Sequence, residues 1–429
     1  MSDPQQENIE EQDGQDLYLN KDEMLEEDLE DTGEPMEDDD DEGELEPELD
    51  EEQQANIDMI NAKDDSIQGF FGHKEPVYAI AIHPNNPEII VSAGGDDKAH
   101  VWNITDGEHA IASLEGHTDS VTSVAFSKDG QFVATGGMDG FVKIWDTSDW
   151  SLKVDLQLGD ECTIGTQGVL FYLQVALTLL SGCGSVCSPF ISSSQLMRSS
   201  VPKGDNMNVF SGHTEMVTCG RFTPDGKAIV SSSSDGSLIM WSPTEGTAVT
   251  KITANDARFN LDGGITAMAV NPAGTIAVAG GAAGGVRAVN LSNGQVVGSF
   301  ECHKEGESIE AVAFLPEGAA GQGPAGVVVT AGTDGVLNVI DLTTMRVRNT
   351  MNIEEPITVL EFQHQSPFFA VGCVDHKVRM FDARTGSQVK EFEGHSEPVL
   401  SVAVSKDGSR IITGSDDGTA LVFDGSSTK

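Results

Sequence analysis

The chain has 429 residues, enough for two average domains or one large one. Its 70 acidic and 24 basic residues give a formal net charge of −46, which argues against nucleic-acid binding through phosphates, because such binding needs Lys and Arg to displace counterions. Residues 1–65 hold 29 of the acidic residues with only Lys21 and Lys63, so −27 falls on this segment and −19 on the remainder.

Residues 1–65 are predicted to be a disordered acidic tail. Runs such as EPMEDDDDEGELEPELDEE have almost no aromatic or β-branched residues, so burial cannot offset the entropy of ordering them.

The start lacks signal-peptide features, and the longest apolar run, residues 170–180, is about half a bilayer span. We therefore expect a soluble monomer of the cytoplasm, with the nucleus as a second location, that binds neither a membrane nor nucleic acid directly. Six irregularly spaced cysteines indicate reduced thiols.

One pattern recurs after residue 66: Gly-His, an apolar strand, a polar turn, a small-residue strand, an Asp turn, and an aromatic-Asp ending. Four clear copies begin with FGHKEPVYAI, EGHTDSVTSV, SGHTEMVTCG and EGHSEPVLSV, and weaker copies begin near Ala254, Cys302 and Glu354. His73 and His395 are 322 residues apart, and seven intervals across that span average 46 residues. Six intervals would need about 54 residues each, well above the usual ~40–45. The spacing therefore predicts eight repeats.

Each repeat alternates apolar and polar residues over short runs, as in residues 121–126, and Asp-Gly turns join neighbouring runs. This pattern is typical of a four-stranded antiparallel blade, and blades of this kind close into a ring that protects their edges. We therefore predict an all-β, eight-bladed propeller over residues 66–429. Residues 66–70 precede the first Gly-His as residues 207–210 precede a later one, so we expect residues 66–70 to complete the last blade.

Four positions recur within the clear repeats: an entry His, a Ser or Thr ten residues before a Trp, an Asp six residues before it, and the Trp. We expect the Asp to accept a hydrogen bond from the His ring and the hydroxyl to link the ring to the indole N–H. A catalytic triad uses similar residues, but a hydrolase needs one such site. Repetition therefore favours a structural network and a protein without enzymatic activity. The sets are His73, Ser92, Asp96 and Trp102; His117, Thr135, Asp139 and Trp145; and His213, Ser231, Asp235 and Trp241.

Other chemistry-bearing patterns are weak. The glycine run at residues 280–285 could cradle a phosphate, but no helix signal follows, which favours a degenerate hairpin. Cys183 and Cys187 have a metal-like separation without a second Cys or His pair nearby. The sequence alone therefore predicts neither a metal nor a cofactor.

An acidic residue follows the entry His by two positions in four repeats, and further Asp residues lie beside the turns or in an entry loop. Entry loops lie on one rim of a propeller, so these side chains should form an acidic ring around the central channel, suited to a Lys- or Arg-rich peptide. Solvated loop charge is the alternative interpretation for any one of them. The candidate partner-binding residues are Glu75, Asp97, Asp119, Glu215, Asp256, Glu397 and Asp416.

The third repeat, about residues 155–203, is degenerate: it has no Trp and no Asp turn. Permissible codons for residues 164–168 and 181–184, read from their third base, give Trp-His-Pro-Arg and Trp-Met-Trp. A frameshift or a retained intron within residues 160–202 would explain this loss. Transcript sequencing would test that hypothesis.

The four clear repeats resemble the WD-repeat propellers across residues 66–429. The acidic tail, GGDDKAHVW in the first repeat, and MRVRNTM followed by FDARTG are similar to angio-associated migratory cell protein and its fungal relatives, which include the ribosome-assembly chaperone called suppressor of QSR truncations. The resemblance implies a dedicated, non-enzymatic chaperone. It would bind the basic N-terminal segment of a large-subunit ribosomal protein of the L-ten or uL-sixteen type and help deliver it to the pre-60S particle.

Two other functions stay open at this point. Phe381-Asp382-Ala383-Arg384 resembles the aromatic-Asp-x-Arg box of substrate receptors of cullin-type ubiquitin ligases, although Arg384 also has an ordinary capping role before Thr385. A general WD-repeat signalling or trafficking scaffold is the third possibility.

Overall fold

The computed structural model describes residues 63–107, 109–157, 186–188, 191–192, 195–201, 206–253, 255–316, 319 and 326–426. The chain divides into two units, Met1–Ile60 and Asn61–Lys429, and every described residue belongs to the second. The predicted disordered tail, residues 1–65, therefore lies outside the described residues except for residues 63–65. In the described ranges, no helix has the length and apolar character needed to cross a membrane.

Within the described part of the second unit the regular elements are β-strands, and most of the sheets are antiparallel meanders whose four strands pair in chain order. We number the blades after the sequence repeats. Blade 1 comprises β2 (Val77–Ile82), β3 (Ile89–Gly94), β4 (Ala99–Asn103) and β5 (Ala110–Leu114). Blade 2 comprises β6 (Val121–Phe126), β7 (Phe132–Gly137), β8 (Phe141–Asp146) and β9 (Leu152–Gln157). Blade 4 comprises β14 (Val217–Phe222), β15 (Ile229–Ser233), β16 (Leu238–Ser242) and β17 (Thr247–Ile252).

The weaker repeats form blades of the same kind. Blade 5 comprises β18 (Ile265–Val270), β19 (Ile276–Gly281), β20 (Gly285–Asn290) and β21 (Gln295–Glu301). Blade 6 comprises β22 (Ile309–Phe314), β23 (Val327–Gly332), β24 (Val336–Asp341) and β25 (Arg346–Asn352). Blade 7 comprises β26 (Ile357–Phe362), β27 (Phe368–Cys373), β28 (Val378–Asp382) and β29 (Ser387–Phe392).

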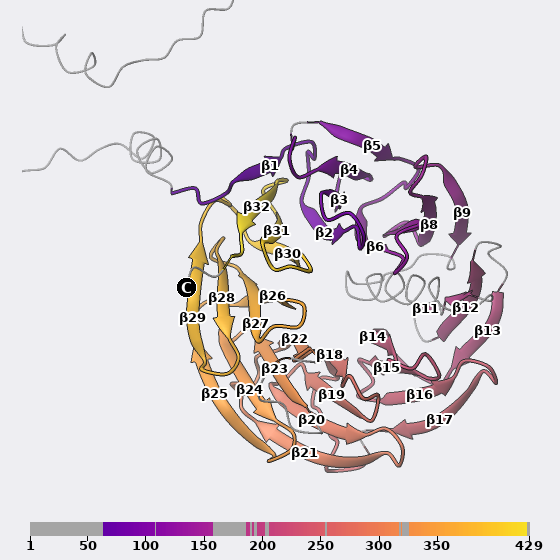
Figure 1. Ribbon diagram of the computed structural model, residues 1–429. Helices are drawn as coiled ribbons and strands as arrows, with labels where there is room; N and C mark the ends of the chain where they lie inside the picture. Colours follow the sequence, from indigo (N-terminus) through magenta and orange to yellow (C-terminus); the bar gives the residue numbers. More distant parts are fainter. Residues whose placement is uncertain are drawn as a thin grey trace, which may run out of the picture. The chain divides into compact units, whose positions relative to one another are not determined.

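The last blade takes its outer strand from the other end of the unit. Blade 8 comprises β30 (Val399–Val404), β31 (Arg410–Ser415), β32 (Ala420–Asp424) and β1 (Gln68–Phe70). Strand β1 runs antiparallel to β32, with Gly69 opposite Leu421, so the predicted completion of the last blade is confirmed. Figure 1 shows β1 beside β32 and the sheets arranged around a common centre. Asp65, the last residue of the predicted tail, also contacts the propeller, because its N–H donates to the Glu393 carbonyl at 2.8 Å.

The predicted all-β propeller is confirmed, but the predicted count of eight blades is wrong: seven blades are regular. The sheet at the third position comprises β10 (Val186–Ser188), β11 (Ile191–Ser192), β12 (Gln195–Val201) and β13 (Asn206–Ser211). Strands β10 and β11 both pair with the same edge of β12, so this sheet is not a four-strand meander. The physical reason lies in the sequence, which lacks the Asp turn and the Trp of the other repeats there. The proposed frameshift falls mostly on residues outside the described ranges.

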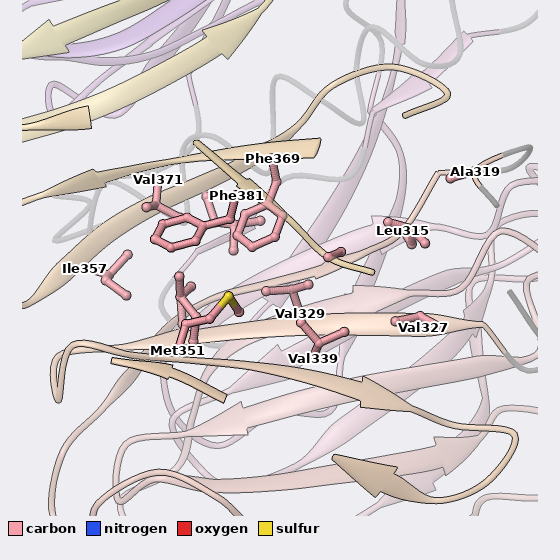
Figure 2. Close-up of a cluster of buried hydrophobic side chains, with 14 of the residues drawn as sticks. Leu315, Ala319, Val327, Val329, Val339, Met351, Ile357, Phe369, Val371 and Phe381 are labelled. Carbon is pink, nitrogen blue, oxygen red and sulfur yellow. The ribbon is translucent and has the colours of Figure 1, made fainter. Parts of the chain in front are cut away.

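The hydrophobic core is divided into clusters that lie between neighbouring blades. Figure 2 shows the cluster between blades 6 and 7, in which Phe369 and Phe381 lie together with ring centroids 5.7 Å apart. The seam between blades 8 and 1 has its own cluster, which contains Phe70, Trp102 and Val422. Because burial of apolar surface couples each blade to the next, the loops of different blades are held in a fixed arrangement.

Candidate protein-binding surface

The entry loops are fixed to the blades by the recurring polar network. In blade 1, His73 Nδ1 lies 3.0 Å from Asp96 Oδ1, and His73 Nε2 lies 2.8 Å from Ser92 Oγ. The Trp102 indole N–H donates to the same Ser92 Oγ at 3.2 Å. Gly94 makes this approach possible, because a Cβ at that position would lie only 2.4 Å from His73 Nδ1.

Blade 2 repeats these contacts, and blade 4 varies them. His117 Nδ1 lies 3.0 Å from Asp139 Oδ2 and His117 Nε2 lies 2.9 Å from Thr135 Oγ1, which accepts from the Trp145 indole at 3.0 Å. In blade 4, His213 Nδ1 instead lies 2.7 Å from Ser237 Oγ and 3.6 Å from the carboxylate of Asp235. The link from the His ring through the hydroxyl to the indole is kept, because Ser231 Oγ lies 2.7 Å from His213 Nε2 and accepts from the Trp241 indole at 2.8 Å. Burial lowers the pKa of His213 to about 4, so the ring is neutral at physiological pH.

Two further blades contain the same arrangement without the Trp. In blade 8, His395 contacts Asp417 at 2.9 Å and Thr413 at 2.7 Å. In blade 6, His303 contacts Asp334 at 3.1 Å and Thr330 at 2.8 Å. Blade 5 has lost the network, and the buried Phe259 and Leu261 occupy that region, with Leu261 against Gly281 and Gly285.

We expect Asp139→Ala to lower the free energy of unfolding by about 1–3 kcal/mol, because it leaves the buried ring of His117 without its acceptor. Besides the His117 ring, Asp139 accepts from the backbone N–H groups of Thr118 and Phe141, both at 3.0 Å. Chemical denaturation of the variant would measure the loss. Lys128→Ala, at an exposed position in a turn of the same blade, is a comparison outside this network. An unchanged unfolding midpoint for Asp139→Ala would contradict the network's role.

One face of the ring is formed by the entry loops together with the turns between the second and third strands, and we call it the entry face. In every regular blade a backbone hydrogen bond joins the two segments, as from Gly95 N to Pro76 O at 2.9 Å and from Asp416 N to Pro398 O at 3.0 Å. Contacts also link successive blades: Ser120 Oγ reaches Gly95 O at 3.4 Å, and Gly418 lies against the Glu75 backbone. The entry face is therefore continuous across blades 8, 1 and 2.

Three of the sequence-predicted acidic residues converge at the seam between blades 8, 1 and 2. Tyr78, on β2, lines the central cavity, and burial raises the pKa of its hydroxyl. The carboxylates of Asp416, Glu75 and Asp119 raise that pKa further, which places all three near the same hydroxyl. These three carboxylates, which we call the seam acidic cluster, are supplied by three different blades and are exposed.

The other four predicted residues lie on the same face but differ in their surroundings. Glu215 and Glu397 are exposed and, within the described part of the chain, neither has an ion pair. Asp97 adopts φ of 62° in the turn of blade 1, at the position where blade 2 has Gly140, so this residue supplies the left-handed backbone conformation of the turn. Asp256 is bound by its neighbour Arg258, with Nη2 at 3.0 Å and Nε at 3.2 Å, so its charge is partly compensated.

The entry face surrounds the mouth of a central cavity of about 1000 Å³. First strands of all the regular blades line this cavity. Three charged residues of these strands, Arg221 on β14, Glu310 on β22 and Glu361 on β26, lie among small residues such as Ala81 and Ala403. Glu361 is exposed to the cavity, and the surrounding blades raise the pKa of its carboxyl to about 7, an effect that Arg221 opposes. A chain segment entering the mouth would therefore meet acidic loops first and a mainly apolar wall below them.

Comparison with known proteins matches the repeats to a known family. The WD domain, G-beta repeat model matches residues 65–103, 109–146, 204–242 and 386–424. An uncharacterized WD repeat-containing protein of Schizosaccharomyces pombe is 32% identical over 97% of this chain and 99% of its own length. Human angio-associated migratory cell protein is 30% identical over 87% of this chain and 83% of its own length. The chain belongs to the WD-repeat family of angio-associated migratory cell protein.

A ribosome assembly protein of similar sequence has known structures. The ribosome assembly protein SQT1 of Saccharomyces cerevisiae is 27% identical over 87% of this chain and 89% of its own length. The crystal structure of Chaetomium thermophilum Sqt1 bound to the N-terminus of ribosomal protein L10 matches with a TM-score of 0.71 and 26% identity, over 84% of this chain and all of that chain.

Several acidic residues of this WD-repeat protein's entry face were missed from the sequence. Glu305 follows the entry His303 by two positions, the same spacing as Glu75 and Glu215, so the signal was present in a weak repeat. The loops of blades 6 and 7 add Glu307, Glu354 and Glu355, opposed on this face by Lys74, Lys304 and Arg258. Nothing in the sequence marked Tyr78, whose place at the mouth depends on the closure of the ring.

Arg384, the residue that suggested a ligase adaptor contact, is held by its own blade. Its Nε and Nη2 donate to Asp382 at 3.0 and 2.7 Å, and its guanidinium lies over the Phe368 ring at 5.8 Å. A similar pair, Arg348 with Asp341, occurs in blade 6 at 2.7 Å. The recurrence favours a local structural role for Arg384.

Proposed function

We propose that this protein is a non-enzymatic chaperone that binds the basic N-terminal segment of a large-subunit ribosomal protein of the L10 (uL16) type in the cytoplasm and releases it during assembly of the 60S subunit. The observation that carries the proposal is the entry face, where the seam acidic cluster, Glu215 and Glu397 surround the mouth of the cavity. A free ribosomal protein is strongly basic, and such a face would neutralise its RNA-binding segment until assembly. The likeness to Sqt1 bound to the L10 N-terminus supports the same partner.

The His-Asp-Ser/Thr sets also favour a scaffold over an enzyme. The ring of His117 is 0% exposed and Asp139 is 4% exposed, so a substrate could not reach them without unfolding the loop. In blades 1, 2 and 4 the hydroxyl that would act as a nucleophile already accepts a hydrogen bond from an indole. Recurrence in five blades is what a structural support requires.

Charge reversal on the entry face tests the proposal. The triple variant Glu75→Lys, Glu215→Lys and Glu397→Lys should weaken binding of a synthetic peptide of the L10 N-terminus by roughly 10- to 100-fold, because each exposed charge contributes about 0.5–1 kcal/mol and 1.4 kcal/mol is tenfold. Asp119 is left intact because its carboxylate accepts from the Ser120 N–H at 2.7 Å. Titration calorimetry at two salt concentrations would also show weakening with salt.

The chain offers a matched control for this experiment. Glu88, Asp106 and Glu245 are exposed and lie in loops that join first to second or third to fourth strands, at the other face of the blades. Their reversal to Lys changes the net charge equally and should leave the affinity within about twofold, because exposed charges beyond a Debye length are screened. Equal losses in both triple variants would indicate a net-charge effect, and no loss in either would contradict the acidic entry face.

A further inference from the structure

Blade 1 contains a cluster that, among the described residues, the other blades lack. His100, on β4, points one ring nitrogen at the carboxylate that also holds the entry histidine: His100 Nε2 lies 3.8 Å from Asp96 Oδ2, and His73 Nδ1 lies 3.0 Å from Asp96 Oδ1. The three potential ligand atoms all lie within 4.8 Å of one another. The residues opposite the network hydroxyl in blades 2, 4 and 8 are Lys143, Ile239 and Leu421, none of which adds an imidazole.

The Asp96 carboxylate is also bonded differently from its counterparts. Asp139, Asp235, Asp334 and Asp417 each accept from two backbone N–H groups, one in the entry loop and one in the turn. Among the described residues, Asp96 accepts from no backbone N–H, and its polar contacts are the two imidazole rings. Its lone pairs are therefore available to a ligand that the other blades could not accommodate.

Both rings are oriented by second hydrogen bonds. His100 Nδ1 lies 2.8 Å from Ser113 Oγ, and His73 Nε2 lies 2.8 Å from Ser92 Oγ. When the serine oxygens accept from these nitrogens, the lone pairs of His100 Nε2 and His73 Nδ1 both face Asp96. Such outer hydrogen bonds are the usual support of metal-binding histidines. The side chains of His73, His100 and Asp96 are 0%, 11% and 12% exposed, so the site is enclosed yet open on one side.

We propose that His73 Nδ1, His100 Nε2 and the Asp96 carboxylate form a binding site for a divalent first-row metal ion, with Zn²⁺ the best match. Two imidazole nitrogens and one carboxylate oxygen suit Zn²⁺, which would complete a tetrahedral shell with water on the open side. Binding requires that the His73 proton move from Nδ1 to Nε2, where Ser92 Oγ accepts it, and that the Ser92 hydroxyl hydrogen turn away from the ring. The inference is independent of the proposed function.

The position of the site gives the ion a structural effect. His73 is three residues after Phe70, the end of β1, which pairs with β32 of blade 8. An ion held between His73 and two residues of blade 1 would therefore fasten the segment that closes the ring. Metal binding should raise the melting temperature of the folded chain, because an ion that binds only the native state stabilises it.

The test uses the full-length, untagged chain and its His100→Leu variant. Leu is the residue that blade 8 carries at this position, Leu421, beside an intact His395 and Asp417 pair. After dialysis against Zn²⁺, we expect about one tightly bound Zn²⁺ per wild-type chain and none in the variant. Added Co²⁺ should give the visible absorption of a tetrahedral site in the wild type alone. Ser113→Ala should keep the site but weaken Zn²⁺ by roughly 10- to 100-fold.

Three results would overturn the proposal: no Zn²⁺ retained by the wild type, equal retention and equal Co²⁺ spectra in wild type and His100→Leu, or a Zn²⁺-dependent rise in melting temperature that survives the substitution. Equal retention would assign the binding to carboxylates elsewhere in this acidic chain. If His100→Leu does not fold, Ser113→Ala decides, because unchanged affinity in that variant contradicts the orienting bond to His100.

Discussion

Phe70→Ala should lower the free energy of unfolding by about 3–5 kcal/mol, the range for removing a buried aromatic ring. Phe70 is 1% exposed and ends β1, and its ring stacks on Trp102 of blade 1 with centroids 5.3 Å apart and planes 5° apart. It therefore joins the strand that completes blade 8 to the core of blade 1. Guanidinium denaturation followed by tryptophan fluorescence would measure the loss.

The neighbouring residue supplies the control. Phe71 is 68% exposed, so Phe71→Ala removes the same ring one residue along the chain without opening the seam. We expect its free energy of unfolding to stay within about 0.5 kcal/mol of wild type, as for most surface substitutions. Equal effects of the two substitutions would mean that the seam does not depend on the packing of β1.

Arg379→Leu is the second substitution with a large expected effect, a loss of about 3–5 kcal/mol. In blade 7, Asp375 and Arg379 replace the His network: Arg379 Nη1 donates to Asp375 Oδ1 at 3.0 Å, and Arg379 Nε donates to Glu391 at 3.0 Å. Arg379 is 10% exposed and Asp375 is 19% exposed, so the substitution leaves a carboxylate nearly buried without its cation. Thermal and chemical unfolding would both report the change.

If the loss in Arg379→Leu comes from the unpaired carboxylate of Asp375, two further results are expected. Adding Asp375→Ala to Arg379→Leu should restore most of the loss, because no uncompensated charge is then left in that position. Burial alone would raise the pKa of Asp375, and the bonds from Arg379 hold it below its usual value. In the single variant that pKa should rise, so the stability deficit should shrink as the pH falls towards it. A pH-independent deficit, or a double variant no more stable than the single one, would contradict this account.

The predictions that rest on the sequence repeats agree with the structure. The strands of the clear and weak repeats, the closure by β1, and the contacts of His73 and His117 follow from spacing, because a buried His needs its partners at fixed positions along adjacent strands. The network of His303 was harder to identify, since Ile340 stands where the other blades carry Trp or Phe. The pair of Asp375 and Arg379 could not be predicted from the sequence, because in no other described repeat does an ion pair take the place of the His network.

The errors arise where repetition fails or where several blades must meet. Blade number was counted from average spacing, which cannot reveal that β10 and β11 share one edge of β12. The acidic face was predicted as a uniform ring, whereas Arg258 compensates Asp256 and the seam brings Asp119 and Asp416 near Tyr78. Side-chain pairing and distances between blades depend on the closed ring and are not encoded in any single repeat.

The seam has a consequence for synthesis of the protein. Strand β1 is made first, but its partner β32 ends at Asp424, so a ribosome must translate almost the whole chain before the two can meet. Asp416 and Glu75 likewise come together only then. A truncated or stalled nascent chain thus lacks the closed seam and the part of the entry face that forms there.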